Sequence, residues 1–309
     1  MQSVECTAPG KVILCGEHSV VYGEPAIAVP VSGLRAHAHV APADAQGLRL
    51  TALDLGESLT LAEAPDDYPL AVIVRLTLAH CSATEPDAEL TMHSDLPIAA
   101  GLGSGAAVSV AAARALALYL GHDLPPEEVS ALAYEVEKLH PGTPSGIDNT
   151  VVAWERPVAF TKGTPPSVFN IARPFYLIIA NSGLHSTTRE IVEGVRQRRE
   201  TDPDYYNTCF KAMGAIAEAA RVAIEQGGIE ALGPLINQNH ALLTRIGVSL
   251  PALDALVAAA RRAGATGAKL TGAGGGGNII ALVTPENANA VRRALQEAGA
   301  VQTWQTTVE

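Results

Sequence analysis

The spacing of apolar residues changes along the chain, from short runs at the start to longer stretches later. Early on, short apolar runs are separated by glycine, proline and polar residues, which is typical of β-strands joined by turns. The strands we expect there are Ser3–Ala8, Val12–Cys15, Ala26–Val31, Leu34–Ala41 and Ala88–Ser94. An alanine-rich stretch then predicts a helix from about Ser104 to Leu120, ended by Gly121, and a second helix follows over Pro126–His140.

Later in the chain, short strands are set among long helical stretches. The expected strands are Val158–Phe160, Tyr176–Ala180, Ile279–Val283 and Val301–Thr307. The expected helices are Thr187–Arg199, Tyr205–Gln226, Ile229–Ile246, Pro251–Arg262 and Pro285–Ala298. A chain of 309 residues exceeds what one hydrophobic core usually organises. With proline and glycine concentrated at 155–172, we expect two domains, 1–165 and 166–309, of mixed α and β structure.

Composition supports a folded protein and argues against nucleic acid as a partner. Apolar residues make up 48% of the chain and charged residues 17%, and the net charge is -11. The densest basic stretch, Arg189–Arg199, has Glu190 and Glu193 interleaved, so it is better explained as a solvated helix face. Phosphate backbones are bound through clustered lysine and arginine, which this chain lacks. An anionic ligand must therefore be bound locally, by backbone amides and a few cations.

Cysteine usage and hydropathy favour a cytoplasmic protein with no membrane partner. The four cysteines form no CxxC pair and no metal-like spacing, which predicts free thiols and no zinc: Cys6, Cys15, Cys81 and Cys209. The run Val12–Cys15 is too short for the core of a signal peptide. The longest apolar stretch, Ala106–Leu120, contains Arg114 and falls short of the roughly 20 residues that span a membrane.

Three segments stand out chemically, and the first is Pro9–Gly23, PGKVILCGEHSVVYG. It places Lys11, Glu17 and His18 beside glycines where a strand meets a turn, so all three could face one cleft. Residue types alone favour the simpler interpretation of a surface lysine and a solvated Glu-His pair.

The second segment is Asp95–Ala107, DLPIAAGLGSGAA, a glycine-rich loop that runs into the predicted helix at Ser104. Small residues allow close backbone approach, and the free amides of a helix N-terminus attract phosphate. The loop lacks the GxxxxGK[ST] pattern, although Ser104 could still reach a Mg²⁺ ion. Its glycines could instead serve only tight helix packing. The candidate nucleotide-binding residues are Pro97, Ala100, Gly101, Leu102, Gly103, Ser104, Gly105 and Ala106.

The same loop also fits the dinucleotide pattern G-x-G-x-x-A, through Gly101, Gly103 and Ala106. An acidic residue, Asp123, lies about 20 residues further on, but it follows a helix and is expected to cap the next one. An NAD-dependent oxidoreductase is therefore the rival from another class, and retention of NAD rather than ATP would distinguish it.

The third segment is Lys269–Asn278, KLTGAGGGGN, with five glycines among ten residues. Such a run contributes little to a core, so its value is backbone freedom for close contact with a ligand or another loop. Gly272, Gly274 and Gly275 are the candidate nucleotide contacts, and a flexible hairpin is the alternative.

Together and in this order, the three segments resemble the three motifs of the GHMP kinases, named for galactokinase, homoserine, mevalonate and phosphomevalonate kinases. The first segment and EVEKLHPGTPSGIDN at 135–149 are most similar to the mevalonate kinase branch, and NSGLHSTTREIV at 181–192 is similar to the family segment that contributes a substrate-site threonine. The resemblance implies a two-domain α+β fold. Its N-terminal domain is of the ribosomal protein S5 domain 2-like type, with a left-handed βαβ unit, and its C-terminal domain is ferredoxin-like.

The resemblance also implies ATP and Mg²⁺ as cofactors and assigns roles by position. Asp148 matches the catalytic base, which accepts the proton of the substrate hydroxyl, and Lys11 matches the lysine beside it. Glu137, eleven residues before Asp148, and Ser104 match the Mg²⁺ ligands. Without the resemblance, Glu137 would pass as an exposed helix residue that pairs with Lys138.

Residues matching the substrate site are Lys11, Glu17, His18, Ser145, Asp148 and Thr188. Thr187 is adjacent to Thr188, so the register is open by one residue, and His140 is better explained as a helix C-cap. The departures from the family pattern are Cys15 in place of an aromatic residue, Gly105 in place of a second serine, Asn278 after the third motif, and Pro141 before the PSGID turn.

We rank phosphorylation of the 5-hydroxyl of mevalonate first, by a protein expected to form a homodimer. Phosphomevalonate kinase and diphosphomevalonate decarboxylase activities use the same fold and stay open, and so does a non-catalytic nucleotide-binding regulator.

Overall fold

The computed structural model describes residues 2–97, 100–139, 145–184 and 187–309. Its contacts divide the chain into two compact units. Unit 1 comprises Met1–Lys11 and Leu34–Glu155, and unit 2 comprises Val12–Gly33 and Arg156–Glu309. The N-terminal segment 12–33 thus groups with the second half of the chain, and the expected cut at residue 165 stays a prediction.

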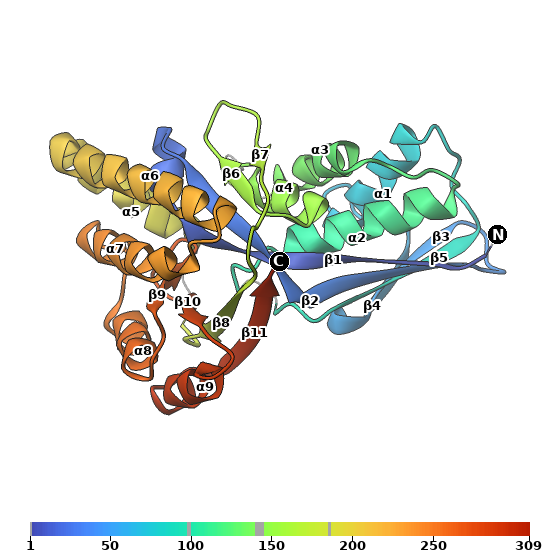
Figure 1. Cartoon of the computed structure of the whole chain (residues 1–309). Coiled ribbons are helices and arrows are strands. Elements are labelled where there is room, and N and C mark those ends of the chain that lie inside the picture. The colour runs from blue at the N-terminus through green and yellow to red at the C-terminus, as the bar shows by residue number, and fades with distance from the viewer. Residues whose placement is uncertain (1, 98–99, 140–144, 185–186) are drawn as a thin grey trace. The chain divides into compact units, whose positions relative to one another are not determined.

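Unit 1 combines a sheet with helices that lie to one side of its strands (Figure 1). Antiparallel pairs join β2 to β5 and β3 to β4, whereas β3 runs parallel to β5. The strands are the first part of β1 (Val4–Cys15), the second part of β2 (Ala26–Pro42), β3 (Leu48–Ala52), β4 (Glu57–Thr60) and β5 (Ala88–Ser94). The helices are α1 (Pro69–His80), α2 (Ser104–Tyr119), α3 (Pro126–Glu137) and α4 (Ile147–Trp154), with a 3-10 turn at Leu53–Leu55.

Strict alternation in β2 gives the unit 1 sheet two different faces. Ala36, Ala38 and Val40 are wholly buried. His37 and His39 point to the opposite face, because successive side chains of a strand alternate. The helix-free side of this sheet therefore carries polar side chains.

Unit 2 contains a second, antiparallel sheet in the order β11-β8-β10-β9. Its strands are β8 (Phe175–Asn181), β9 (Gly267–Thr271), β10 (Asn278–Val283) and β11 (Gln302–Val308). Short β6 (Val158–Phe160) and β7 (Ser167–Val168) pair with each other, and β6 pairs with the start of β2.

The helices of unit 2 bury their apolar sides in one core with this sheet. They are α5 (Thr188–Thr201), α6 (Pro203–Glu225), α7 (Leu232–Arg245), α8 (Pro251–Arg262) and α9 (Ala288–Glu297), with 3-10 turns at Ser19–Tyr22 and Ile229–Ala231. Phe210 and Met213 of α6, Leu243 of α7 and Leu270 of β9 lie at its centre. The α+β class expected from the sequence is confirmed.

Some local expectations differ from the structure. The cap of α3 is Pro125, with Pro126 in the first turn, so Asp123 does not have the capping role expected of it. Pro126 suits that position because a first-turn amide has no helical partner to lose. Lys138 pairs with Glu135 rather than with Glu137.

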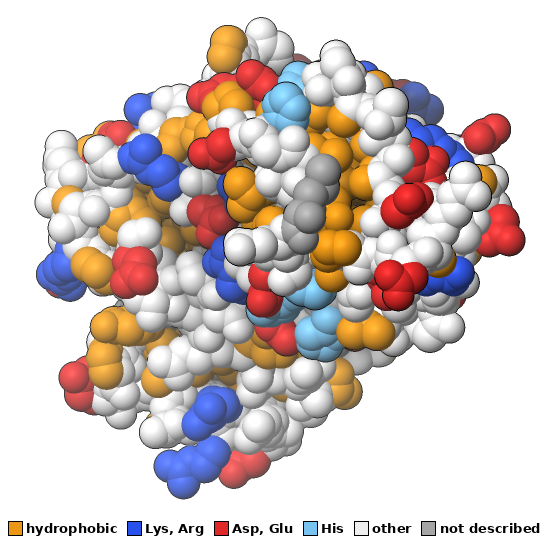
Figure 2. All heavy atoms as spheres, turned by 90° about the vertical axis from the view of Figure 1, so that its right-hand side faces the viewer, with side chains coloured by type: hydrophobic (Ala, Val, Ile, Leu, Met, Phe, Trp, Pro, Cys, Tyr) orange, Lys and Arg blue, Asp and Glu red, His pale blue; other side chains and the backbone are white. Residues whose placement is uncertain are grey.

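The hydropathy of the helices, the state of the cysteines and the distribution of surface charge can each be described from the structure. Among the residues that the structure describes, no helix has the length and apolar character needed to cross a membrane. All four cysteines are free thiols, and burial raises the pKa of the Cys15 thiol to about 12. In Figure 2, basic and acidic side chains are interspersed over the visible face, without a continuous basic area.

Candidate active site

In unit 1, Lys11 and Asp148 form an ion pair although they are far apart in the sequence. The ammonium Nζ of Lys11 lies 2.9 Å from Oδ1 of Asp148. The Lys11 side chain is 7% exposed and that of Asp148 is 33% exposed, so one side of the carboxylate remains accessible. A lysine this buried needs an anionic partner, and Asp148 supplies it.

The start of α4 fixes the position of Asp148. Gly146 precedes the helix with φ of 81°, a left-handed conformation that favours glycine. Asp148 lies in the first turn of α4, where the helix dipole favours negative charge. The next residue, Asn149, donates its backbone N–H to Glu137 Oε1 at 3.1 Å and its side-chain amide to Ser130 Oγ at 2.8 Å. These bonds hold α4 against α3.

Glu137, the last residue of α3, completes an acidic pair with Asp148. The pKa of Glu137 is raised to about 8, mainly by burial and then by the charge of Asp148, while Lys11 and the Asn149 N–H oppose the rise. The Lys11 ammonium thus contacts Asp148 directly and acts on Glu137 through its charge. A site short of positive charge in this way suits a cation with a preference for oxygen ligands.

The second glycine-rich segment lies directly against the Lys11–Asp148 pair. Lys11 donates its backbone N–H to the carbonyl of Leu102 at 2.8 Å. Gly103 has φ of 73°, and a Cβ atom there would lie 2.9 Å from Cγ of Lys11 and 3.7 Å from Oδ2 of Asp148. Only glycine allows the loop to approach so closely, so the loop, the ammonium and the carboxylate share one small volume.

The same segment ends at the N-terminus of α2, whose first residue is Ser104. The first amides of a helix have no intrahelical acceptor and can bind an anion. Ala100 and Ala106 are buried, Pro97 is half-buried, and Gly105 has open space where a Cβ would lie. The segment therefore presents backbone rather than bulky side chains at this point.

In unit 2, Glu17 is wholly engaged by two buried partners. Its Oε1 forms an ion pair with Nζ of Lys269, and its Oε2 accepts a hydrogen bond of 3.0 Å from the side-chain amide of Asn239. Glu17 and Lys269 are 1% and 0% exposed. The pair joins the first segment to the start of the third.

His18 is held in a strained conformation next to this pair. Its φ of 63° is unusual for a residue other than glycine. Its Nε2 lies 2.7 Å from the carbonyl of Ala273, so Nε2 carries the proton and donates it. The pKa of His18 is lowered to about 4, mainly by burial, with smaller contributions from the charges of Arg198 and Lys269 and an opposing effect of the bond to Ala273. The neutral ring thus keeps Nδ1 as a hydrogen-bond acceptor.

The third segment forms the turn between β9 and β10, and its glycines have different surroundings. A Cβ at Gly274 would lie 2.3 Å from the carbonyl oxygen of Val248, and Gly275 donates its N–H to the same oxygen at 2.8 Å. Gly272 has no atom within 4 Å of that position. Close packing against the backbone thus explains Gly274, whereas Gly272 faces open space.

The remaining candidates lie at helix starts or outside the described residues. Thr188 is the first residue of α5, and Thr187 caps this helix by accepting the Glu190 N–H through its hydroxyl. Ser145 is exposed, and its hydroxyl accepts the Ile147 N–H. His140 and Pro141 lie outside the described residues.

The structure thus groups the candidates within each unit. Unit 1 brings together Lys11, Glu137, Asp148 and the Gly101–Ser104 loop, and unit 2 brings Glu17 and His18 to the third segment. Sequence reasoning did not single out Lys269 or Asn239 individually. A lysine inside GAKLT, an otherwise uncharged strand, was the available signal, because a charge in a buried strand requires a partner.

Family comparisons agree with this arrangement of motifs. A family model described as GHMP kinases N terminal domain matches residues 67–155, and one described as GHMP kinases C terminal matches residues 220–301. The mevalonate kinase of Thermococcus sibiricus is 37% identical over 315 residues, which cover 96% of this chain and 93% of the relative.

Solved structures show the same fold. The crystal structure of L. major mevalonate kinase in complex with R-mevalonate has a TM-score of 0.84 and 29% identity, and covers 99% of this chain and 95% of that one. The Methanococcus jannaschii mevalonate kinase has a TM-score of 0.86 and 26% identity, with 100% and 98% coverage.

Proposed function

Since this chain belongs to the mevalonate kinase family of GHMP kinases, we propose that it transfers the terminal phosphoryl group of ATP to the 5-hydroxyl of mevalonate. The products are 5-phosphomevalonate and ADP. The observation that carries the proposal is the Lys11–Asp148 pair lying against the Gly103 loop, since it combines a base, a cation and a phosphate-binding backbone. Family membership also disfavours the oxidoreductase alternative.

In this mechanism Asp148 orients the substrate hydroxyl and accepts its proton as the bond to phosphorus forms. Phosphoryl transfer has a loose transition state, so positioning of the nucleophile matters more than the strength of the base. Lys11 pairs with the Asp148 carboxylate and offsets negative charge on the attacking and equatorial oxygens. The 33% exposure of the Asp148 side chain leaves room for this contact.

The phosphates of ATP bind to the amides at the start of α2, with Gly103 and Ser104 nearest to the Lys11–Asp148 pair. A Mg²⁺ ion fits here because burial and the nearby charge of Asp148 disfavour the ionised form of Glu137, and a bound cation would offset both effects. Glu137 and the Ser104 hydroxyl would hold the ion, which when bound neutralises charge on the phosphates.

The family resemblance supports a substrate-binding role for His18 and Thr188, both of which belong to unit 2. Neutral His18 offers Nδ1 to a substrate hydroxyl, and Thr188 offers its hydroxyl. Both carboxylate oxygens of Glu17 already have partners, so we assign Glu17 to holding His18 and the Lys269 strand in place. Ser145, exposed before α4, is available to the substrate near Asp148.

A substrate panel tests the proposal. ADP release is measured with mevalonate, phosphomevalonate, mevalonate diphosphate, galactose and homoserine, for the parent and for Asp148→Asn and Lys11→Ala. We expect activity with mevalonate and a loss of at least about a hundredfold in kcat for both variants. A parent that uses another alcohol of the panel and not mevalonate would refute the substrate but keep the kinase class.

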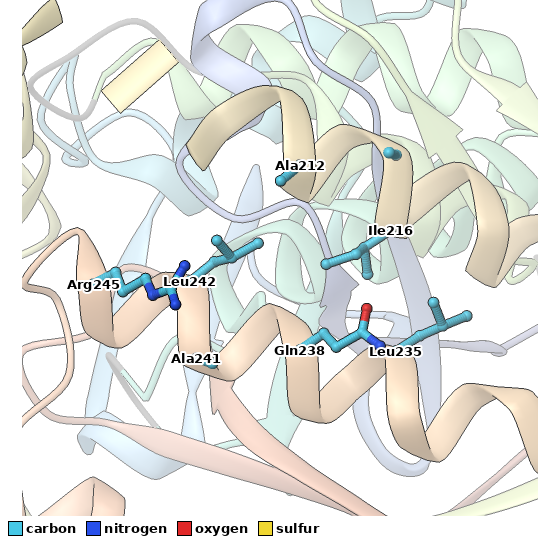
Figure 3. Close-up of a pocket in the computed structure, with 8 residues that line it drawn as sticks. Ala212, Ile216, Leu235, Gln238, Ala241, Leu242 and Arg245 are labelled. Atoms are coloured by element: carbon cyan, nitrogen blue, oxygen red, sulfur yellow. The ribbon is translucent and has the colours of Figure 1, made fainter. Parts of the chain in front are cut away.

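We further propose that the protein is a homodimer, joined through the exposed side of α6 and α7. A shallow groove there is lined by small and aliphatic side chains, among them Ala212, Ala215, Leu235 and Leu242 (Figure 3). Small residues let helices approach closely. In an antiparallel pairing of two copies of α6 about a two-fold axis between Gly214 and Ala215, Lys211 of one copy faces Glu218 of the other, so the charges are self-complementary.

Sedimentation velocity distinguishes the two states. We expect a dimer for the parent and a monomer for Ala215→Arg, because two guanidinium groups would meet at the symmetry axis. Ala215→Ser is the matched control and should remain dimeric. A monomeric parent would overturn this part of the proposal.

A further inference from the structure

Two histidines face each other on the polar side of the unit 1 sheet, and the proposed reaction uses neither. His37 of β2 and His93 of β5 are directly opposite in the antiparallel register. Their ring centroids are 6.0 Å apart and the ring planes differ by 26°. Both belong to regular strands, so the backbone fixes the spacing of the two imidazoles.

A carboxylate lies near the outer nitrogen, Nδ1, of each ring, and the one beside His93 is within hydrogen-bonding distance. His93 Nδ1 lies 2.8 Å from Oδ1 of Asp54, and His37 Nδ1 lies 3.9 Å from Oε1 of Glu5. Asp54 is itself fixed, because its Oδ2 accepts the Ser94 N–H at 2.7 Å. The orientation of His93 in particular is therefore set by a hydrogen-bonded carboxylate.

The two Nε2 atoms converge on a third carboxylate. His37 Nε2 lies 3.3 Å from Oδ2 of Asp95, and His93 Nε2 lies 3.6 Å from Oδ1 of the same residue. The side chains of His37 and His93 are 35% and 51% exposed, so ions in solution can reach them. Figure 2 shows histidine side chains next to acidic ones at the surface.

This cluster has more acceptors than protons. A neutral imidazole carries a single N–H, yet each ring has a carboxylate near both of its nitrogens. With two neutral rings and three carboxylates, two of these nitrogen–carboxylate contacts lack a hydrogen. A cation bound between the Nε2 atoms removes that repulsion, whereas water does so less effectively.

We propose that His37 and His93 form a surface binding site for a borderline divalent cation such as Zn²⁺. Their Nε2 atoms are the ligands, and Asp54 holds the Nδ1–H of His93, as outer carboxylates do for metal-bound histidines. In the described residues, no three His, Cys, Asp or Glu side chains are arranged to hold a metal ion. Water therefore completes the coordination, and Asp95 accepts hydrogen bonds from it.

The ligand type separates this site from the Mg²⁺ that accompanies ATP. Imidazole suits zinc, copper and nickel, whereas Mg²⁺ requires oxygen ligands and retains its waters. Millimolar Mg²⁺ should therefore leave the site free for Zn²⁺. Because the ligands must be unprotonated, affinity should fall as the medium becomes acidic.

The test is isothermal titration of tag-free, chelator-treated protein with Zn²⁺ at pH 7.5, without nucleotide and with Mg²⁺ present. His37→Gln and His93→Gln should each weaken one binding event at least tenfold, and titration at pH 5.5 should weaken it in the parent. The control is His39→Gln, which lies on the same face of β2 opposite Thr91 and should bind like the parent.

Circular dichroism of each variant checks that the sheet is intact, and ADP release should be unchanged in all of them. Equal Zn²⁺ affinity of the parent, His37→Gln and His93→Gln would overturn the proposal. So would an equal loss in His39→Gln, because the ligand pair would then be misassigned.

Discussion

At the scale of single residues, the buried ion pair of Glu17 and Lys269 makes the stability of the protein sensitive to the loss of either partner. Both side chains are almost completely removed from water, and Asn239 satisfies the second carboxylate oxygen. Desolvation of two charges costs several kcal/mol, so the net contribution of such a pair to stability is small. Its loss on one side is costly, because a lone buried charge remains.

We predict that Lys269→Met lowers the free energy of unfolding by about 3–5 kcal/mol. The double variant Glu17→Gln/Lys269→Met should recover most of this loss, since no buried charge is left. Urea denaturation followed by fluorescence measures both values. A single variant within about 1 kcal/mol of the parent would show that water reaches the pair.

Residue-level prediction depended on sequence resemblance more than on physical pattern. Lys11 and Asp148 are far apart in the chain, and only the family motifs suggested that they act together. The partner of Glu17 was not identified, because no local periodicity relates positions 17 and 269. Such pairs become visible only when the strands that carry them are placed.

At the scale of elements, the loop before α2 combines two glycines with the same backbone strain and different surroundings. Gly101 and Gly103 have φ of 75° and 73°. A Cβ at Gly101 would meet nothing within 4 Å, whereas one at Gly103 would collide with Lys11. Substitutions at the two glycines therefore distinguish the effect of backbone strain from the effect of displacing the lysine.

Gly103→Ala should therefore reduce kcat/KM for mevalonate by about a hundredfold, which is the effect expected of a displacement near 1 Å. Gly101→Ala should reduce it much less. Both should lose about 1–2 kcal/mol of stability, because both force an alanine into the left-handed region. Steady-state kinetics and thermal denaturation of the two variants are compared, and equal kinetic losses would contradict a steric role for Gly103.

Elements with clear boundary signals were predicted, and those without them were missed. Helices α2, α6 and α8 coincide with apolar stretches that are bounded by glycine or proline. Strand β9 escaped prediction because it is buried on both faces and shows no alternation. Helix α1 was missed because PLAVIVRLTLAH, rich in β-branched residues, has no clear helical period. Helix α9 starts at Ala288, later than expected, because Asn287 accepts the Thr284 N–H in a turn.

At the scale of the whole molecule, two buried neutral histidines make stability depend on pH. Besides His18, His240 of α7 receives the Leu270 N–H at Nδ1 and faces Asp254 with Nε2. The pKa of His240 is lowered to about 4, mainly by burial and then by the charge of Arg261, while Asp254 opposes the shift. In the unfolded chain, both rings become protonated below about pH 6.5.

The unfolded state thus binds more protons than the folded state between about pH 6.5 and 4. Stability from these rings should be complete above pH 6.5 and should decline as the pH falls to 4, by at most about 3 kcal/mol for each ring. Chemical denaturation at several pH values measures the slope. The variant His240→Gln should show a shallower slope, and an unchanged slope would exclude this residue as a cause.

Length alone predicted two bodies, and composition predicted their mixed α and β content. The allocation of residues 12–33 could not be predicted, because it follows from which sheet and which core these residues join. Hydrophobic pattern identifies a strand, but it does not say with which distant half of the chain the strand packs.

Strands β1 and β2 each begin in one unit and end in the other, with the changes at Lys11–Val12 and Gly33–Leu34. Because the two units alternate along the chain, a single crossover between two related genes splits at least one unit. Part of that unit then comes from each parent gene. Transfer of an intact unit takes crossovers at all three boundaries. Inheritance should therefore keep the two units together, so that substitutions on either side accumulate as one evolutionary lineage.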